Sequence, residues 1–310
     1  MEYVLLALCT VTAAIQSPFK KLYQRKTSKG AFLFSAMISL VAALFFGVGA
    51  LVGGTPAYSL AVLPYSVGFA ACYGVCAVSS VLALGCGSLA LTSLISGYSL
   101  VLPTVFGLIL WEDPLYLTQV IGFVILVVSL YFANKRTAPV AKAGEAENES
   151  NTDKFSVKWL IYVSLMFVSN GGCAIMQQLQ QNKFSEQNGY TYDFKNEFMF
   201  VALLIVVALF VGIGLWRERR DLKTVARLGA LPAVLTGLCN GLTNLLVMVV
   251  VGVSISAAVF FPVISAGGLV ISYVISVLFF KERFSNVQKL GILLGLVSVI
   301  LLNLSFVQLL

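Results

Sequence analysis

Two asparagine side chains four residues apart, Asn240 and Asn244, interrupt an otherwise apolar stretch at residues 231–251. A spacing of i, i+4 places both on one face of a helix, and Thr236 shares that face. Each carboxamide offers hydrogen-bond donors and acceptors, so the pair could bind amino, carboxyl or hydroxyl groups of a small molecule. The alternative is interhelical hydrogen bonding, which contributes about 0.6 kcal/mol per bond on average in a membrane. Both interpretations stay open at this point.

Other polar and aromatic side chains lie within apolar segments and are candidates for the same site. Gln16 and Asn170 fall at corresponding depths in the two halves of the chain, and Tyr73 or Tyr98 could wall a pocket or pack in the core. Gln177 lies nearer a membrane end and is interpreted as interfacial. The complete set of predicted substrate-binding residues is Asn240, Asn244, Tyr73, Gln16, Asn170, Ser79 and Tyr98.

Residue types needed for catalysis or metal binding are scarce. The chain has no histidine, and its six cysteines all lie within apolar segments, where small core residues are the expected role. Cys72 and Cys76 share a helix face, but two thiols without histidines make a poor zinc site. No phosphate-binding loop and no pair of carboxylates within apolar segments is present. The sequence therefore predicts neither an enzyme, nor a metal site, nor a bound cofactor.

The elements that position these side chains are expected to be membrane-spanning helices. The 310 residues are 59% hydrophobic and only 11% charged, against about 25% charged in soluble domains. Residues 30–111 contain no charged residue, and residues 231–280 form a second charge-free run. About 20 apolar residues span a bilayer, so these runs hold several crossings. The predicted fold class is an all-α, multi-pass membrane protein.

Hydropathy and turn residues divide the chain into ten expected helices. Their ranges are 4–20, 31–52, 64–85, 88–110, 116–133, 157–177, 197–216, 231–251, 255–279 and 287–307. Residues 135–154 have mixed charge and small side chains, typical of a disordered tether. The expected organisation is thus a first five-helix unit at 1–134, a linker at 135–154 and a second unit at 155–310.

Two sequence echoes indicate that the second unit repeats the first. Residues 108–122 and 277–291 each contain an apolar helix end, a glutamate (Glu112 or Glu282), a polar turn and a second apolar helix. Residues 19–24 likewise align with residues 176–181. A five-helix unit begins and ends on opposite sides of a membrane, so a tandem copy must be inverted.

Basic residues predict the orientation. Lys20 and Lys21 are counted in the loop after the first helix, and of the 20 lysines and arginines only Lys183 and Lys195 fall on the opposite side. The positive-inside rule then places the linker in the cytoplasm and both termini outside. The net charge of +7 is explained by these loops rather than by nucleic-acid binding. The expected location is the plasma membrane, specifically a bacterial inner membrane.

The segments Trp111-Glu112-Asp113-Pro114-Leu115 and Phe280-Lys281-Glu282-Arg283-Phe284, each leading into an apolar helix, carry a family resemblance. With ten helices in a five-plus-five repeat, the chain resembles an EamA-type member of the drug/metabolite transporter superfamily. The resemblance implies alternating access through a central pathway, with the helices at 116–133 and 287–307 peripheral. The implied pathway is lined by the helices at 4–20, 64–85, 88–110, 157–177, 231–251 and 255–279. It also implies that Glu112 and Glu282 anchor their turns rather than touch substrate.

The expected charge of the substrate follows from the absence of acidic and basic residues in the first helix. Small proton-driven drug exporters of this superfamily keep a carboxylate in the middle of that helix, whereas Tyr3 to Phe19 contains no acid or base. We therefore expect a secondary transporter of a small organic metabolite, neutral or zwitterionic and amino-acid-like. The alternatives are a lipid-carrier flippase and a non-transporting scaffold or assembly subunit. Expected partners are the substrate and the lipid bilayer, with monomer and homodimer both left open.

Overall fold

A computed structural model describes residues 2–52, 60–99, 101–110, 116–134, 157–184, 189, 194–251 and 257–302. The helices are α1 (Glu2–Lys26), α2 (Ala31–Val52), α3 (Leu63–Cys86), α4 (Leu89–Tyr98), α5 (Val101–Leu110), α6 (Leu117–Asn134), α7 (Val157–Lys183), α8 (Lys195–Arg217), α9 (Leu222–Val251), α10 (Ala257–Leu278) and α11 (Asn286–Leu302). Short 3-10 helices precede α3 and α9, at Leu60–Val62 and Arg219–Asp221. The expected linker at 135–154 and Glu112 lie outside the described residues.

The described part of the chain is an all-α, multi-pass membrane protein, which confirms the predicted fold class. Within it, five helical segments are long and apolar enough to span a membrane: Ala31–Val52, Leu60–Cys86, Val157–Lys183, Lys195–Arg217 and Arg219–Met248. Large apolar side chains such as Leu209, Val124 and Val127 are exposed on the outer faces. Helices that are apolar on every side fit a lipid surrounding, because water would penalise those exposed faces.

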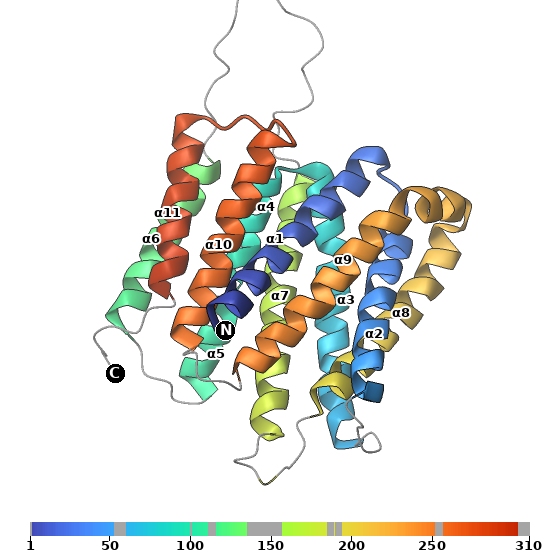
Figure 1. Ribbon diagram of the computed structural model, residues 1–310. Helices are drawn as coiled ribbons and strands as arrows, with labels where there is room; N and C mark the ends of the chain where they lie inside the picture. Colours follow the sequence, from blue (N-terminus) through green and yellow to red (C-terminus); the bar gives the residue numbers. More distant parts are fainter. Residues whose placement is uncertain are drawn as a thin grey trace, which may run out of the picture.

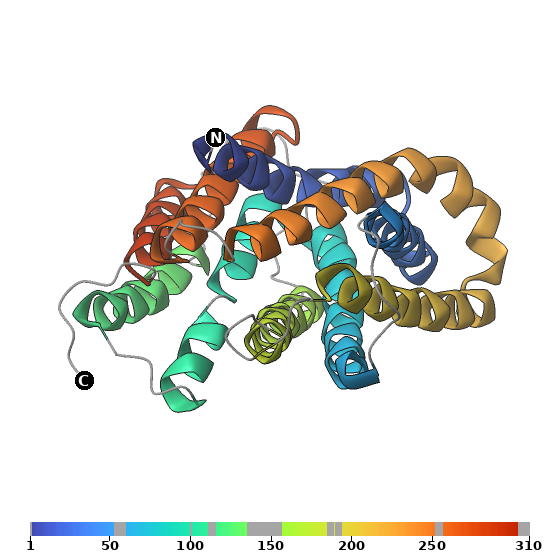
Figure 2. The ribbon, with the colours of Figure 1, turned by 60° about the horizontal axis from the view of Figure 1, so that its bottom comes forward.

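The helices pack in pairs drawn from the two halves of the chain. α6 packs against α11 on one flank of the molecule, and α2 packs against α8 on the other. Between these flanks α1 packs against α9 and α10, while α3 packs against α7 (Figures 1 and 2). The helices of the centre are therefore α1, α3, α4, α7, α9 and α10.

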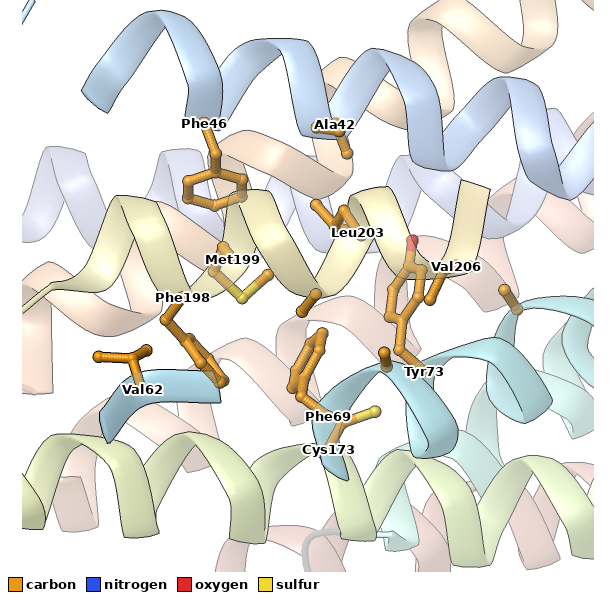
Figure 3. Packing of buried hydrophobic residues seen from close by; sticks show 14 of the residues in the cluster. Ala42, Phe46, Val62, Phe69, Tyr73, Cys173, Phe198, Met199, Leu203 and Val206 are labelled. Atoms are coloured by element: carbon orange, nitrogen blue, oxygen red, sulfur yellow. The ribbon is translucent and has the colours of Figure 1, made fainter. Parts of the chain in front are cut away.

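Aromatic and aliphatic side chains fill the space between α2, α3 and α8. Phe46 from α2, Phe69 from α3, and Phe198 and Met199 from α8 are fully buried in one cluster, which Cys173 of α7 also joins (Figure 3). Phe69 and Phe198 meet edge to face with ring centroids 5.4 Å apart. This cluster fixes α3 beside the centre of the molecule, and Tyr73 lies one turn beyond Phe69 on the same helix face.

Small residues allow close helix contacts at Gly237 and Gly241, which lie four residues apart on α9. A methyl group on Gly237 would lie 2.7 Å from the carbonyl oxygen of Ile38 on α2, and one on Gly241 would lie 2.8 Å from the Phe45 ring. Because only glycine fits at these distances, the two residues bring α9 against α2.

The expected helix at 88–110 is wrong in one respect, because it divides into α4 and α5 near Ser99. Pro103 has no N–H to donate to the carbonyl four residues earlier, which belongs to Ser99. Instead Leu102 N–H donates to Ser99 O over 3.1 Å, and the Ser99 hydroxyl donates to Ser96 O over 2.6 Å. These bonds close the end of α4 and turn the chain into α5.

Three helices, α1, α7 and α9, are clearly longer than expected, and in α1 and α9 the difference changes the role of basic residues. α1 continues to Lys26 instead of ending near residue 20, and α9 begins at Leu222 instead of near residue 231. Lys20 and Lys21 are thus helical residues rather than loop residues, as are Lys223 and Arg227. In both helices the apolar stretch is shorter than the helix itself, because the turns at a helix end can carry long charged side chains whose charged groups reach water.

Candidate functional site

A cavity of about 310 Å³ lies in the centre of the molecule, within the range typical of small-molecule sites. Its described walls come from α1, α3, α4, α7, α9 and α10. These are the six helices that the family resemblance implies, and α6 and α11 contribute no described lining residue. The geometry therefore matches the predicted helix assignment of the pathway.

Asn240 is the centre of a hydrogen-bond network that joins three helices across this cavity. The Tyr73 hydroxyl of α3 donates to Asn240 Oδ1 over 3.1 Å, and Asn240 Nδ2 donates to Gln16 Oε1 of α1 over 3.1 Å. Gln16 Nε2 then donates to Thr243 Oγ1 over 3.1 Å. All four side chains line the cavity. The network thus serves both interpretations of Asn240, since it ties helices together and presents polar groups to the cavity.

Asn244 lies one turn further along α9 and reaches α7. Gln177 Nε2 donates to Asn244 Oδ1 over 3.0 Å, while Asn244 Nδ2 donates to the Asn240 carbonyl over 2.9 Å. Both Gln177 and Asn244 line the cavity. The interpretation of Gln177 as interfacial is therefore wrong, because α7 continues for six residues beyond it before ending at Lys183.

Asn170 lies on α7 beside the break between α4 and α5. Its Nδ2 donates to the Ser99 hydroxyl over 2.6 Å, and the Cys76 thiol of α3 lies 3.7 Å from its Oδ1. Gly171 follows directly, and a methyl group there would lie 2.8 Å from the Ser99 carbonyl oxygen. The small residue lets α7 approach the backbone where α4 ends, and Asn170 then bonds to the buried Ser99 hydroxyl.

Two predicted site residues lie elsewhere. Tyr98 is 1% exposed and is not a lining residue; its hydroxyl lies 2.6 Å from Ser129 Oγ of α6, which in turn donates to the Gly291 carbonyl of α11. It packs outward, between α4 and the pair of α6 and α11, so its assignment to the cavity is wrong.

Ser79 is buried and also absent from the described lining, whereas its neighbour Ser80 lines the cavity. One residue along a helix turns the side chain by about 100°, which moves it to another face.

Lys20 is a cavity residue that the sequence interpretation assigned to a loop. Its Nζ donates to the Ser80 hydroxyl of α3 over 3.0 Å. Among the described lining residues it is the one ionisable side chain of Lys, Arg, Asp or Glu type. Two signals could have found it: Lys20 follows Gln16 by four residues, and the sequence echo aligns it with Gln177.

Beyond the Lys20 end of the cavity, Glu282 joins the two halves of the chain. Lys281 adopts a left-handed conformation (φ 54°) that ends α10, and Glu282 N–H donates to Ser276 O over 3.1 Å. The Glu282 carboxylate accepts hydrogen bonds from Ser276, from Lys21 of α1, and from Ser88 Oγ over 2.8 Å. The expectation that Glu282 anchors its turn is confirmed.

The same carboxylate also occupies the N-terminus of α4. The Leu89 N–H lies 3.0 and 3.1 Å from the two Glu282 oxygens, so the negative charge meets the free N–H groups of a helix start. Burial opposes ionisation of Glu282, but Lys21, Ser276 and the Leu89 N–H together outweigh it, and the pKa of Glu282 lies below its usual value. Lys21 additionally donates to Gly87 O over 3.0 Å.

Comparisons with known proteins agree with this architecture. Residues 157–304 match the model of the EamA-like transporter family. Among the solved structures 24 chains match, and one crystal structure, described only as that of a protein, aligns over 96% of this chain and 95% of its own. That alignment has a TM-score of 0.54 and 12% sequence identity, so it shows a shared fold alone. The search of curated proteins gave no match.

Proposed function

We propose that the protein is a membrane transporter of the drug/metabolite type that moves a small organic metabolite by alternating access, because residues 157–304 match the model of the EamA-like transporter family. The observation that carries this proposal is the central cavity walled by six helices and lined by the amide network of Gln16, Asn240 and Asn244. A cavity with several donors and acceptors can hold a polar metabolite, whereas a packed scaffold would have no need of one.

The chemistry of the lining favours a neutral or zwitterionic, amino-acid-like substrate. Carboxamide and hydroxyl groups on all six lining helices offer both donors and acceptors, so they can bind an amino and a carboxyl group at once. The described lining contains no Asp or Glu, which a strictly cationic substrate would need. Transport is secondary, because the sequence contains no nucleotide-binding loop.

Helix packing supports the proposal that the two halves are inverted repeats. α1 contacts α9 and α10, and the corresponding helix of the second half, α7, contacts α3 and α4. Likewise α2 contacts α9 while α8 contacts α3. Exchanging the halves thus interchanges these contacts, as expected for two units related by a two-fold axis in the membrane plane.

The contact between Lys21 and Glu282 supports a gate at one end of the cavity. Lys20 and Thr92 line the cavity, while Lys21 and the α4 start at Leu89 lie just beyond it, held by Glu282. Breaking this contact would let α10 separate from α1 and α4. We therefore assign the gate to the ion pair, and the conformation described is the one closed on that face.

Charge distribution supports an orientation with this gate in the cytoplasm of a cell whose plasma membrane holds the protein. Lys21, Arg25, Lys29 and Glu218 lie on the Glu282 face, where Lys29 pairs with Asp221 at 3.8 Å. Lys183, the last residue of α7, and Lys195, the first residue of α8, lie on the opposite face. The positive-inside rule then gives cytoplasmic α10–α11 and α1–α2 loops.

The proposed function is tested by a thermal-shift screen of the purified protein in lipid nanodiscs. Amino acids, nucleosides, sugars and cationic drugs are each titrated, because a ligand of the folded state raises the melting temperature with concentration. We expect stabilisation by amino acids, followed by uptake of the same compounds into proteoliposomes. Stabilisation by cationic drugs alone would contradict the substrate class, and a flat response with no uptake of any class would contradict a transporter of small metabolites.

A further inference from the structure

Lys20 is a positive charge that faces the cavity without an acidic partner among the described residues. The ion pairs found there join Lys21 to Glu282 and Lys29 to Asp221, and neither involves Lys20. Lys20 instead donates one hydrogen bond to Ser80. An ammonium group has three N–H donors, so two remain for another acceptor.

The adjacent residue shows what the same fold does with a lysine that it neutralises. Lys21 is 7% exposed and is bound by the Glu282 carboxylate and the Gly87 carbonyl. Lys20 and Lys21 are consecutive, yet the Glu282 carboxylate binds only Lys21, which points away from the cavity. A charge inside a membrane protein is costly without a counter-ion, so an anion bound in the cavity would stabilise the charged form of Lys20.

The remaining lining at this end of the cavity also suits an oxyanion. Hydroxyl groups come from Thr92, Ser93 and Ser272, and the buried Ser93 Oγ has no hydrogen-bond partner among the described residues. Hydroxyls donate to anionic oxygens, and none of the described lining residues brings a competing negative charge.

We propose that Lys20 binds a carboxylate of the substrate, so that the transported metabolite is a small carboxylic acid. This inference rests on the proposed transport function and narrows its substrate class. A single lysine balances the one charge of a carboxylate, whereas a phosphate ester carries nearly two charges. The amide network around Gln16 and Asn240 binds the neutral or amino part of the molecule, so an ammonium group is not required.

The test compares matched ligands on the full-length protein in nanodiscs. The panel contains amino acids, the corresponding 2-hydroxy acids and the amino acid carboxamides, and thermal shift gives an apparent Kd for each. We expect the two carboxylate series to bind at least tenfold more tightly than the carboxamides. In Lys20→Gln this preference is lost, and in Lys20→Arg, which keeps the charge, it is retained. Lys26→Gln, an exposed lysine six residues further along α1, serves as the control and keeps the preference.

The outcomes separate this inference from the proposed function. If wild-type protein binds carboxamides as tightly as carboxylates, or Lys20→Gln keeps the carboxylate preference, the role of Lys20 is wrong. Uptake of neutral compounds into proteoliposomes would in that case still support the proposed transport function. Absence of binding and uptake for every compound, including sugars and nucleosides, would overturn the proposed function as well. If Lys20→Gln does not fold, a Lys20→Arg protein that binds carboxamides as tightly as carboxylates overturns the inference.

Discussion

Lys21 of α1 and Glu282 of the α10–α11 loop form a buried ion pair although 261 positions separate them in the chain. The pair is enclosed by Phe280, whose ring centroid lies 5.4 Å from Lys21 Nζ and 5.0 Å from Arg25 Cζ. Glu282 also holds the start of α4. One carboxylate thereby joins three helices that wall the cavity, and for this reason the proposed gate is tested at Glu282.

Glu282→Gln keeps the side-chain size but leaves Lys21 buried without a counter-ion. Breaking a buried pair costs about 3–5 kcal/mol, so we expect a lower melting temperature and easier opening on this face. Cys76 lines the cavity and reports that opening when the other five cysteines are replaced. We expect faster labelling of Cys76 by an impermeant maleimide in Glu282→Gln.

The matched control is Asp221→Asn, which removes a carboxylate from the surface pair with Lys29 on the same face. Exposed pairs contribute about 0–1 kcal/mol, so labelling should stay at the wild-type rate. A fall in stability without faster labelling would show that the Glu282 contact is structural and not a gate.

Acidification should weaken the same contact. The pKa of Glu282 is lowered in the folded protein, so its contribution to stability is present above the unfolded value, about 4.3, and is lost as the pH falls through the folded value. We expect the difference in melting temperature between wild type and Glu282→Gln to shrink between pH 6 and pH 3. A difference that stays constant over this range would mean that the charge of Glu282 does not stabilise the fold.

The polar positions of the cavity could be predicted because each interrupts an apolar helix. Gln16, Tyr73, Asn170, Asn240 and Asn244 all lie on the cavity wall, and helical spacing was sufficient to place Asn240 and Asn244 together. Their part in substrate binding stays a prediction, since each also bonds to a neighbouring residue.

Residues whose placement depends on distant helices could not be predicted in the same way. Tyr98 turns outward because Ser129 of α6 and Gly295 of α11 leave room for its hydroxyl, and no local pattern near residue 98 encodes those partners. Lys20 was missed for a different reason: hydropathy ended the first helix at the first charge, although the helix continues to Lys26.

Asn240→Ala removes the group that links Gln16 and Tyr73 and that faces the cavity. Losing one or two hydrogen bonds to a ligand costs about 1–3 kcal/mol, so we expect substrate to bind roughly tenfold more weakly or worse, with normal membrane expression. Asn286→Ala, at an exposed position at the start of α11, is the control in the same thermal-shift titration. Unchanged binding and transport would assign Asn240 to helix packing.

Gly268 allows the cavity to be filled without disturbing its walls. It lines the cavity, and a methyl group added there meets no atom within 4 Å. We expect Gly268→Leu to abolish most substrate uptake into proteoliposomes while leaving the melting temperature near that of wild type. Gly212 on α8 has equally open surroundings but is exposed on the outer face, so Gly212→Leu should transport normally. Normal uptake by Gly268→Leu would show that this cavity is not the pathway.

Gly171 holds α7 against the break between α4 and α5, and the smallest possible enlargement should disturb it. A methyl group there would lie 2.5 Å from Leu102 Cδ1 and 2.8 Å from the backbone oxygen of Ser99, which cannot rotate away. Overpacking of this kind costs about 1–3 kcal/mol, more than the gain of up to about 1 kcal/mol from alanine in a helix. We expect Gly171→Ala to melt at a lower temperature and to weaken substrate binding, because the adjacent Asn170 would move from Ser99.

Gly212→Ala, where the methyl group meets nothing, should be as stable as wild type or more so. Equal melting temperatures for the two variants would show that the approach of α7 to Ser99 is looser than these distances indicate.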